Sequence, residues 1–157
     1  MSSATAARAW ARGGVVLAVV LAADQIVKAL VVSALQRGEE RDLVLGIKLV
    51  NTRNTGVAFG QLQDAGAVVA VVIAIAIGAL LAYFARNAHV PLIWLPTGML
   101  LGGALGNVVD RIREGAVIDY LKLPYWPAFY VADASITIGV VVMLVVMERG
   151  ERTRAST

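Results

Sequence analysis

The chain has 157 residues, of which 59% are hydrophobic and 16% are charged, and its formal net charge is +3. This composition excludes an ordinary soluble domain, and the small, scattered charge argues against nucleic acid as a partner. The absence of cysteine excludes disulfides and a cysteine nucleophile, and with one histidine, His89, we expect neither a Ser-His-Asp triad nor a histidine-rich metal site. Any chemistry must use carboxylates, amides, hydroxyls, lysine and arginine, and we expect no metal and no cofactor.

Four apolar segments approach or reach the length of a membrane span, for which a hydrocarbon core about 30 Å thick requires about 20 residues. They cover residues 13–34, 65–85, 91–109 and 134–147. Arg8 and Arg12 precede the first segment like the charged end of a signal peptide, but no convincing small-residue cleavage site follows. The sequence therefore predicts an α-helical integral membrane protein with four transmembrane helices, the first uncleaved, in a single domain over residues 1–157.

Two ionisable residues interrupt the first apolar segment. Asp24 and Lys28 are four residues apart and so share one face of a helix, with the acid on the N-terminal side as an ion pair prefers. Charged groups inside a membrane are unfavourable unless they are paired or face protein and water. Two interpretations stay open: a structural ion pair that locks the first helix to the bundle, or a pair that faces a polar cavity and positions a substrate or a carboxylate pair.

The segment between the first two predicted helices, residues 36–64, is polar. Leucine or isoleucine occupies every second position from 43 to 49, and this period of two predicts a half-buried strand over 43–50. Residues 51–60 are rich in turn formers and side-chain amides, and a loop of this length is uncommon without a function. We expect the segment to form a small platform lying on the bilayer.

The third predicted helix carries a ridge of glycines followed by a polar face. Glycine recurs at every fourth position from 98 to 106, a pattern that allows another helix to approach closely. Asn107, Asp110 and Arg111 follow at spacings of three and four residues. These three side chains therefore share one face where the helix leaves the membrane.

Four spans place both termini on one side of the membrane and the loops 36–64 and 110–132 together on the other. Arginines crowd the termini next to the spans, and positively charged flanks of this kind are typical of the cytoplasmic side. We therefore expect cytoplasmic termini and extracytoplasmic loops.

Two aspartates bracket the second half of the second loop. Asp119 follows an apolar run, and Asp133 stands at the head of the next one. Taken singly, Asp119 is typical of a solvated loop acid and Asp133 of a helix N-cap. Held close together, two carboxylates share a proton and titrate as a unit. Such a pair can hydrolyse an amide, because the ionised partner takes a proton from water while the protonated partner hydrogen-bonds the scissile carbonyl.

Five motifs occur in the same order as in the lipoprotein signal peptidases, the signal peptidase II family, which the chain resembles over nearly its whole length. They are DQIVK at 24–28, NTGVAF at 54–59, GGALGNVVDR at 102–111, VIDY at 117–120 and VADAS at 131–135. The resemblance implies an aspartyl peptidase of the bacterial inner membrane, with four spans, an extracytoplasmic β-cradle and a short surface helix, and we expect it to be a monomer. Its implied partners are membrane lipid and diacylglyceryl-modified prolipoproteins, which this family cleaves just before the lipid-bearing cysteine.

Carried over residue by residue, the resemblance makes Asp119 and Asp133 the catalytic pair and implies that Asp110 supports Arg111. It assigns substrate-binding or supporting positions to eight residues, Asn54, Gly56, Asn107, Asp110, Arg111, Tyr130, Asp24 and Lys28. Tyr130 departs from the family pattern, which usually has asparagine there. A phenol is bulkier than an amide and has one hydroxyl where the amide has separate donor and acceptor groups.

Other functions stay open on the residues alone. Asp24, Lys28 and Arg111 are compatible with an ion or proton relay in a small membrane carrier. Tyr130 is compatible with a catalytically altered paralogue, and the glycine ridge with a non-catalytic membrane scaffold.

Overall fold

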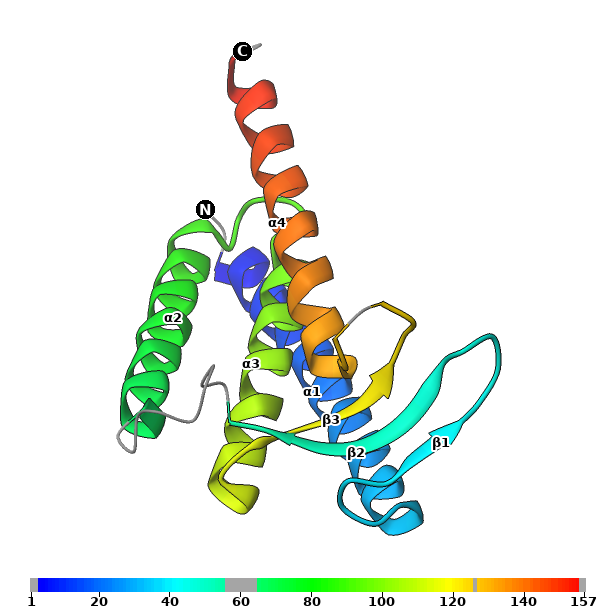
Figure 1. The fold of residues 1–157 in the computed structure, drawn as a ribbon. Helices are drawn as coiled ribbons and strands as arrows, with labels where there is room; N and C mark the ends of the chain where they lie inside the picture. The colour runs from blue at the N-terminus through cyan, green and yellow to red at the C-terminus, as the bar shows by residue number, and fades with distance from the viewer. Residues whose placement is uncertain (1–2, 56–64, 126, 156–157) are drawn as a thin grey trace.

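A computed structural model describes residues 3–55, 65–125 and 127–155. These residues form four helices, α1 (Ser3–Ala34), α2 (Ala65–Asn87), α3 (Trp94–Glu114) and α4 (Val131–Ala155), and three strands, β1 (Glu40–Asp42), β2 (Lys48–Asn54) and β3 (Val117–Lys122). Figure 1 shows the two ends of the chain at one end of the molecule and the small sheet at the other. The two predicted polar loops therefore contribute to the same end.

Within the described residues, three helices are long and apolar enough to cross a membrane, over Ala4–Ala34, Ala67–Asn87 and Val131–Gly150. α2 illustrates this apolar character, because large apolar side chains such as Val68, Val71 and Ile75 are exposed on its surface. A helix that is apolar on all sides belongs either in a protein core or in a membrane. The chain is therefore a helical membrane protein, as its composition predicts.

α3 differs from the predicted third span at both ends. It begins at Trp94 instead of residue 91, because Leu92 has a φ of 64° and interrupts the helical backbone. It also continues past residue 109 to Glu114 and ends at Gly115, whose φ is 69° and whose N–H donates to the carbonyl of Arg111. A glycine in the left-handed region is a common helix end. The extra turn is charged, and α3 is not one of the three helices that meet the length and apolarity of a span.

The predicted glycine ridge allows α3, the central helix, to pack closely against α1. α3 contacts α1, α2 and α4. A Cβ atom added to Gly102 would lie 2.8 Å from the Cβ of Val20 and 2.9 Å from the carbonyl oxygen of Leu17. A Cβ on Gly98 would lie 2.6 Å from the carbonyl oxygen of Gly13, and one on Gly106 would lie 2.7 Å from the carboxylate of Asp24. Any larger residue at these positions would push the two helices apart.

The three strands form one antiparallel sheet in the order β1-β2-β3. β2 pairs with β3 so that Thr52 lies opposite Asp119, and a bulge interrupts the pairing between Leu49 and Thr52. This pairing joins the first polar loop to the second, as the predicted topology requires. A short surface helix is not among the elements formed by residues 3–55, 65–125 and 127–155.

The predicted strand over 43–50 is wrong in its first half. Residues 43–47 connect β1 to β2 as a turn, in which Leu45 has a φ of 54° and Gly46 a φ of 77°. Strands do not accommodate positive φ values, so the alternation of apolar residues here has another cause than a strand. Residues 51–54, which the sequence places in a loop, instead complete β2.

A cluster of buried apolar side chains fixes β3 against the end of α1 and the start of α4. Its members are Val31, Leu35, Val117, Tyr120, Tyr130 and Ala132. The cluster therefore connects the strand that carries Asp119 to the helix that carries Asp133.

Candidate active site

Asp119 lies in β3 with a side chain that is 6% exposed. Its Oδ2 accepts a hydrogen bond from Nδ2 of Asn54, the last residue of β2, at 3.2 Å. The hydroxyl of Thr52 donates to its backbone carbonyl at 3.3 Å. The other carboxylate oxygen, Oδ1, is buried and makes no hydrogen bond with the described residues. One oxygen is thus held by the protein, and the other can bind a water molecule or a substrate.

Burial raises the pKa of Asp119 to about 6. The hydrogen bond from Asn54 and the charge of Lys28 lower this pKa, whereas the negative charges of Asp133 and Asp110 raise it. A carboxyl group with such a pKa exchanges its proton close to neutral pH, which suits general acid–base chemistry. The effect of Asp133 also places the two aspartates within electrostatic reach of each other.

Asp133 lies in the first turn of α4 and its side chain is exposed. It is the third residue of the helix, so it does not occupy the N-cap position that one interpretation gave it. The first two N–H groups of α4 bond elsewhere: Val131 donates to the hydroxyl of Tyr120 at 3.0 Å and Ala132 donates to Asp24 Oδ1 at 2.9 Å. The carboxylate of Asp133 is therefore not needed for these two groups.

Tyr130, the position that departs from the family pattern, is a buried member of the same site. Burial raises the pKa of its phenol, and the charges of Asp133 and Asp119 raise it further, against a hydrogen bond with the Asn107 side chain that lowers it. The phenol therefore keeps its proton. The ring also faces Lys28, whose Nζ is 4.5 Å from the ring centroid, as in a cation–π contact.

Asn107 and Arg111 lie one turn apart on α3, and Nη1 of Arg111 donates to the Asn107 carbonyl at 3.2 Å. Asn107 Oδ1 and Arg111 Nε are buried without a hydrogen bond to the described residues, as is Asp119 Oδ1. All three residues act on the pKa of Tyr130, so they surround one side chain. Buried polar atoms in proteins are nearly always hydrogen-bonded. Three that are not, at one site, are free to bind water or polar groups of a ligand.

Three buried charges lie beside this surface. Lys28 Nζ is 2.7 Å from an oxygen of Asp24 and 2.7 Å from an oxygen of Asp110. These side chains are at most 3% exposed, which favours the structural ion pair over a pair that faces a cavity. Asp110 bonds to Lys28 and to the N–H of Ile118, whereas the resemblance implies that it supports Arg111.

Comparison with known proteins identifies the family. A family profile described as signal peptidase (SPase) II matches residues 16–148. The lipoprotein signal peptidase of Halothermothrix orenii is 34% identical over 139 residues, which cover 88% of this chain and 96% of that protein. The lipoprotein signal peptidase of Pelotomaculum thermopropionicum is 38% identical over 127 residues, which cover 80% and 84%. The chain belongs to the signal peptidase II family.

A solved structure also matches this signal peptidase II fold. It is described as a bacterial membrane enzyme, and it superposes with a TM-score of 0.80 at 26% identity, covering 86% of this chain and 91% of that one. Signal peptidase II proteins are aspartic peptidases, so this family member is a hydrolase of the membrane. The predicted family and enzyme class are confirmed, and a carrier or scaffold function is not needed to explain the polar residues.

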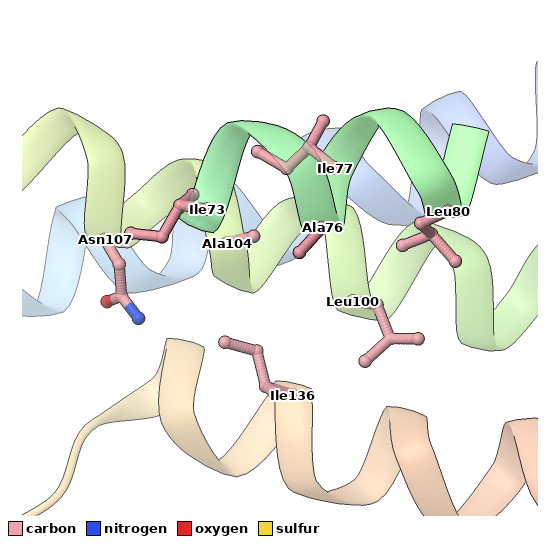
Figure 2. A pocket seen from close by; sticks show the side chains of 8 residues that line it. All are labelled: Ile73, Ala76, Ile77, Leu80, Leu100, Ala104, Asn107 and Ile136. Atoms are coloured by element: carbon pink, nitrogen blue, oxygen red, sulfur yellow. The ribbon is translucent and has the colours of Figure 1, made fainter. Parts of the chain in front are cut away.

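An apolar cavity of about 370 Å³ lies between α2, α3 and α4 of this signal peptidase II family member. Figure 2 shows the amide of Asn107 at one end of it, with the remaining wall formed by aliphatic side chains. The lining residues are Ile73, Ala76, Ile77, Leu80, Leu100, Ala104, Asn107 and Ile136. Because Asn107 also belongs to the polar site, the cavity and the polar site adjoin at this side chain.

Sequence reasoning missed two residues that hold the peptidase site together. Gln25 Nε2 donates to Asp110 Oδ1 at 3.0 Å and to Asp24 Oδ2 at 3.3 Å. The hydroxyl of Tyr120 accepts the N–H of Val131. Gln25 lies in the family motif DQIVK and Tyr120 in the motif VIDY. Each directly follows a predicted site residue, and this position in the sequence could have indicated both of them.

Gly56, a predicted supporting residue, lies outside the described residues. Within residues 3–55, 65–125 and 127–155, no group of three or more histidine, cysteine, aspartate or glutamate side chains could hold a metal ion.

Proposed function

We propose that this chain removes the signal peptide from diacylglyceryl-modified prolipoproteins, cutting immediately before the lipidated cysteine, with Asp119 and Asp133 as its catalytic pair. The observation that carries the proposal is the Asp119 carboxyl. It is buried, its pKa is about 6, one oxygen is held by Asn54 and the other is unbonded, and the charge of Asp133 reaches it. The related proteins are lipoprotein signal peptidases, which supports the substrate class.

In this mechanism Asp119 carries the proton of the pair, because burial raises its pKa. Asp133 takes a proton from a water molecule whose oxygen attacks the scissile carbonyl carbon, while Asp119 donates its proton to the carbonyl oxygen. Asp133 then gives its new proton to the leaving nitrogen as the carbon–nitrogen bond breaks. Asp119 regains a proton from the hydroxyl that becomes the product carboxyl, which restores the starting state.

The unbonded polar atoms beside the pair hold the peptide. Arg111 Nε donates to a substrate carbonyl, and Asn107 Oδ1 accepts a substrate N–H, since each is buried without a partner among the described residues. The protonated phenol of Tyr130 adds a hydrogen-bond donor close to both aspartates. These groups would place the scissile peptide against the catalytic pair, which is the main requirement for rapid hydrolysis.

The apolar cavity between α2, α3 and α4 takes the hydrocarbon part of the substrate. Its wall is aliphatic except at Asn107, so acyl chains fit it and peptide groups do not. Because Asn107 adjoins the polar site, a substrate with a lipid next to its scissile bond would fill both at once. This arrangement favours a lipidated peptide over an ordinary one.

α3 serves as a fourth span in this proposal, since its 21 residues extend about 30 Å at a rise of about 1.5 Å per residue. Its charged end then lies at the membrane surface with the sheet. Both termini are cytoplasmic, the site faces the extracytoplasmic side, and one chain acts alone as a single domain of the inner membrane.

Purified protein and a synthetic diacylglyceryl-modified prolipoprotein test the proposal. We expect Asp119→Asn and Asp133→Asn each to lower kcat by about 10³-fold, because each removes one half of the acid–base pair. Asp42→Asn, an exposed aspartate in the same sheet, is the matched control and should retain full activity. If either site variant keeps full activity with unchanged thermal unfolding, the assignment of the pair is wrong.

A further inference from the structure

Asp24, Lys28 and Asp110 form a buried cluster whose residues are not among those that line the apolar cavity and do not hydrogen-bond the three unbonded polar atoms. Lys28 Nζ is 2.7 Å from Oδ2 of both Asp24 and Asp110, and so joins α1 to α3. Gln25 bridges the two carboxylates. Replacing buried ion pairs by apolar residues of similar volume is often neutral or stabilising. Stability alone therefore gives no reason for three charges in this place.

Each of the two carboxylates in the buried cluster accepts one hydrogen bond from a backbone N–H group outside the cluster. Asp110 Oδ2 accepts the N–H of Ile118 at 3.1 Å. Asp24 Oδ1 accepts the N–H of Ala132 at 2.9 Å. In both cases the donor is the residue immediately before an aspartate of the catalytic pair.

A third hydrogen bond ties the two backbone segments directly to each other. The N–H of Val131 donates to the hydroxyl of Tyr120 at 3.0 Å, and Tyr120 directly follows Asp119 in β3. The first N–H groups of a helix have no partner within it, so α4 needs acceptors from elsewhere. It receives them from β3 and, through Asp24, from α1.

We propose that the buried cluster positions the catalytic pair: Lys28 holds Asp24 and Asp110 at a fixed separation, and each of them fixes the backbone just before one catalytic aspartate. The proposal rests on the function proposed above. Because one ammonium group bonds both carboxylates, movement of α1 relative to α3 would stretch a short ionic contact. A displacement of about 1 Å at a catalytic group can lower the rate about 100-fold. The buried cluster can therefore affect the rate strongly without contacting the substrate.

Two substitutions at Asp110 separate positioning from simple packing. Asp110→Asn keeps an oxygen that can accept the N–H of Ile118 and leaves Lys28 paired with Asp24. Asp110→Ala removes that acceptor. We expect Asp110→Ala to lower kcat about 100-fold with KM unchanged, and Asp110→Asn to lower it less than about 10-fold.

The pH profile of Asp110→Asn tests the electrostatic effect of Asp110 on Asp119, separately from the hydrogen bond that this variant keeps. The groups that act on Asp119 are Asn54 in β2, Asp133 in α4, Lys28 in α1 and Asp110 in α3. The negative charge of Asp110 raises the pKa of Asp119, so its removal lowers that pKa. The alkaline limb of the kcat profile, in which kcat falls as pH rises, should therefore move to lower pH in this variant.

Glu40 offers the matched control, because it bridges Lys48 and Lys122 at 3.1 and 2.8 Å in an exposed charged cluster that also includes Asp42. Glu40→Gln should leave kcat and its pH profile unchanged. A folded Asp110→Ala with wild-type kcat overturns the proposal. If that variant does not fold, a wild-type kcat in folded Asp24→Ala, which removes the acceptor of the Ala132 N–H, overturns it. Full activity in Asp119→Asn would instead refute the proposed function. If Asp119→Asn is inactive while Asp110→Ala has the wild-type kcat, only the positioning role is refuted.

Discussion

The carboxyl of Asp119 is held by Asn54, which can be substituted without altering either aspartate of the proposed catalytic pair. The hydrogen bond from Asn54 lowers the pKa of Asp119, so we expect that pKa to rise above about 6 in Asn54→Ala. Asp119 then keeps its proton to higher pH. Because kcat falls as the general acid loses its proton, the alkaline limb of kcat should move to higher pH, the opposite of the shift in Asp110→Asn.

Measurement of kcat against pH in detergent or lipid nanodiscs tests this shift. Ser33→Ala is a suitable control, since Ser33 is exposed on α1 and its hydroxyl donates to the nearby carbonyl of Leu30. It should leave the limb in place. If the alkaline limb of the kcat profile is unchanged or moves to lower pH in Asn54→Ala, Asp119 is not the general acid.

Tyr130 shows what one unusual residue means inside a family site. The sequence marks it as a departure from the family pattern, which usually has asparagine at this position. In the structure Tyr130 makes a ring contact that an asparagine side chain cannot make. Its ring faces Lys28 of the buried cluster, while its phenol lies within reach of both aspartates. The aromatic ring thus adds a contact between the buried cluster and the catalytic pair.

At the scale of helices, the contact between α1 and α3 depends on the absence of side chains at the glycine ridge. A Cβ on Gly102 would meet the backbone carbonyl of Leu17 at 2.9 Å, and backbone cannot move aside. We expect Gly102→Ala to lower the free energy of unfolding by about 1–3 kcal/mol, as overpacking does, measured by thermal or chemical unfolding in detergent.

Gly78 in α2 is the control for this substitution. Nothing lies within 4 Å of a Cβ added there, and alanine stabilises a helix by about 0.5–1 kcal/mol relative to glycine. Gly78→Ala should therefore be neutral or slightly stabilising. Equal destabilisation by both substitutions would show that the glycine ridge does not determine the contact between α1 and α3.

At the scale of the whole molecule, the proposed orientation can be tested by labelling, because the chain has no cysteine. Tyr125 is fully exposed in the loop after β3, and His89 is exposed in the turn between α2 and α3. A maleimide that cannot cross membranes should label Tyr125→Cys in intact spheroplasts and His89→Cys only after permeabilisation. The reverse pattern would show that the site faces the cytoplasm.

The sequence by itself predicted four spans, three of which coincide with helices that are long and apolar enough to cross a membrane, and it indicated which residues could carry chemistry. Long apolar segments have few alternatives to a membrane span, because the chain must cover about 30 Å of hydrocarbon with its backbone fully hydrogen-bonded. Polar residues in such surroundings are conspicuous, and for this reason Asp24, Lys28, Asn107 and Arg111 could be selected from the sequence.

Only the tertiary structure decided how those residues are connected. The turn at Leu45 ends an apparent strand, and the pairing of β2 with β3 brings Asn54 to Asp119, 65 positions further along the chain. Asp110 bonds Lys28 of α1 and the N–H of Ile118, which its position beside Arg111 on α3 does not reveal. Spacing along one helix predicts which residues share a face. It does not predict which distant carboxylate reaches a given ammonium or N–H group, since that depends on how close α1 and α3 approach at their glycines.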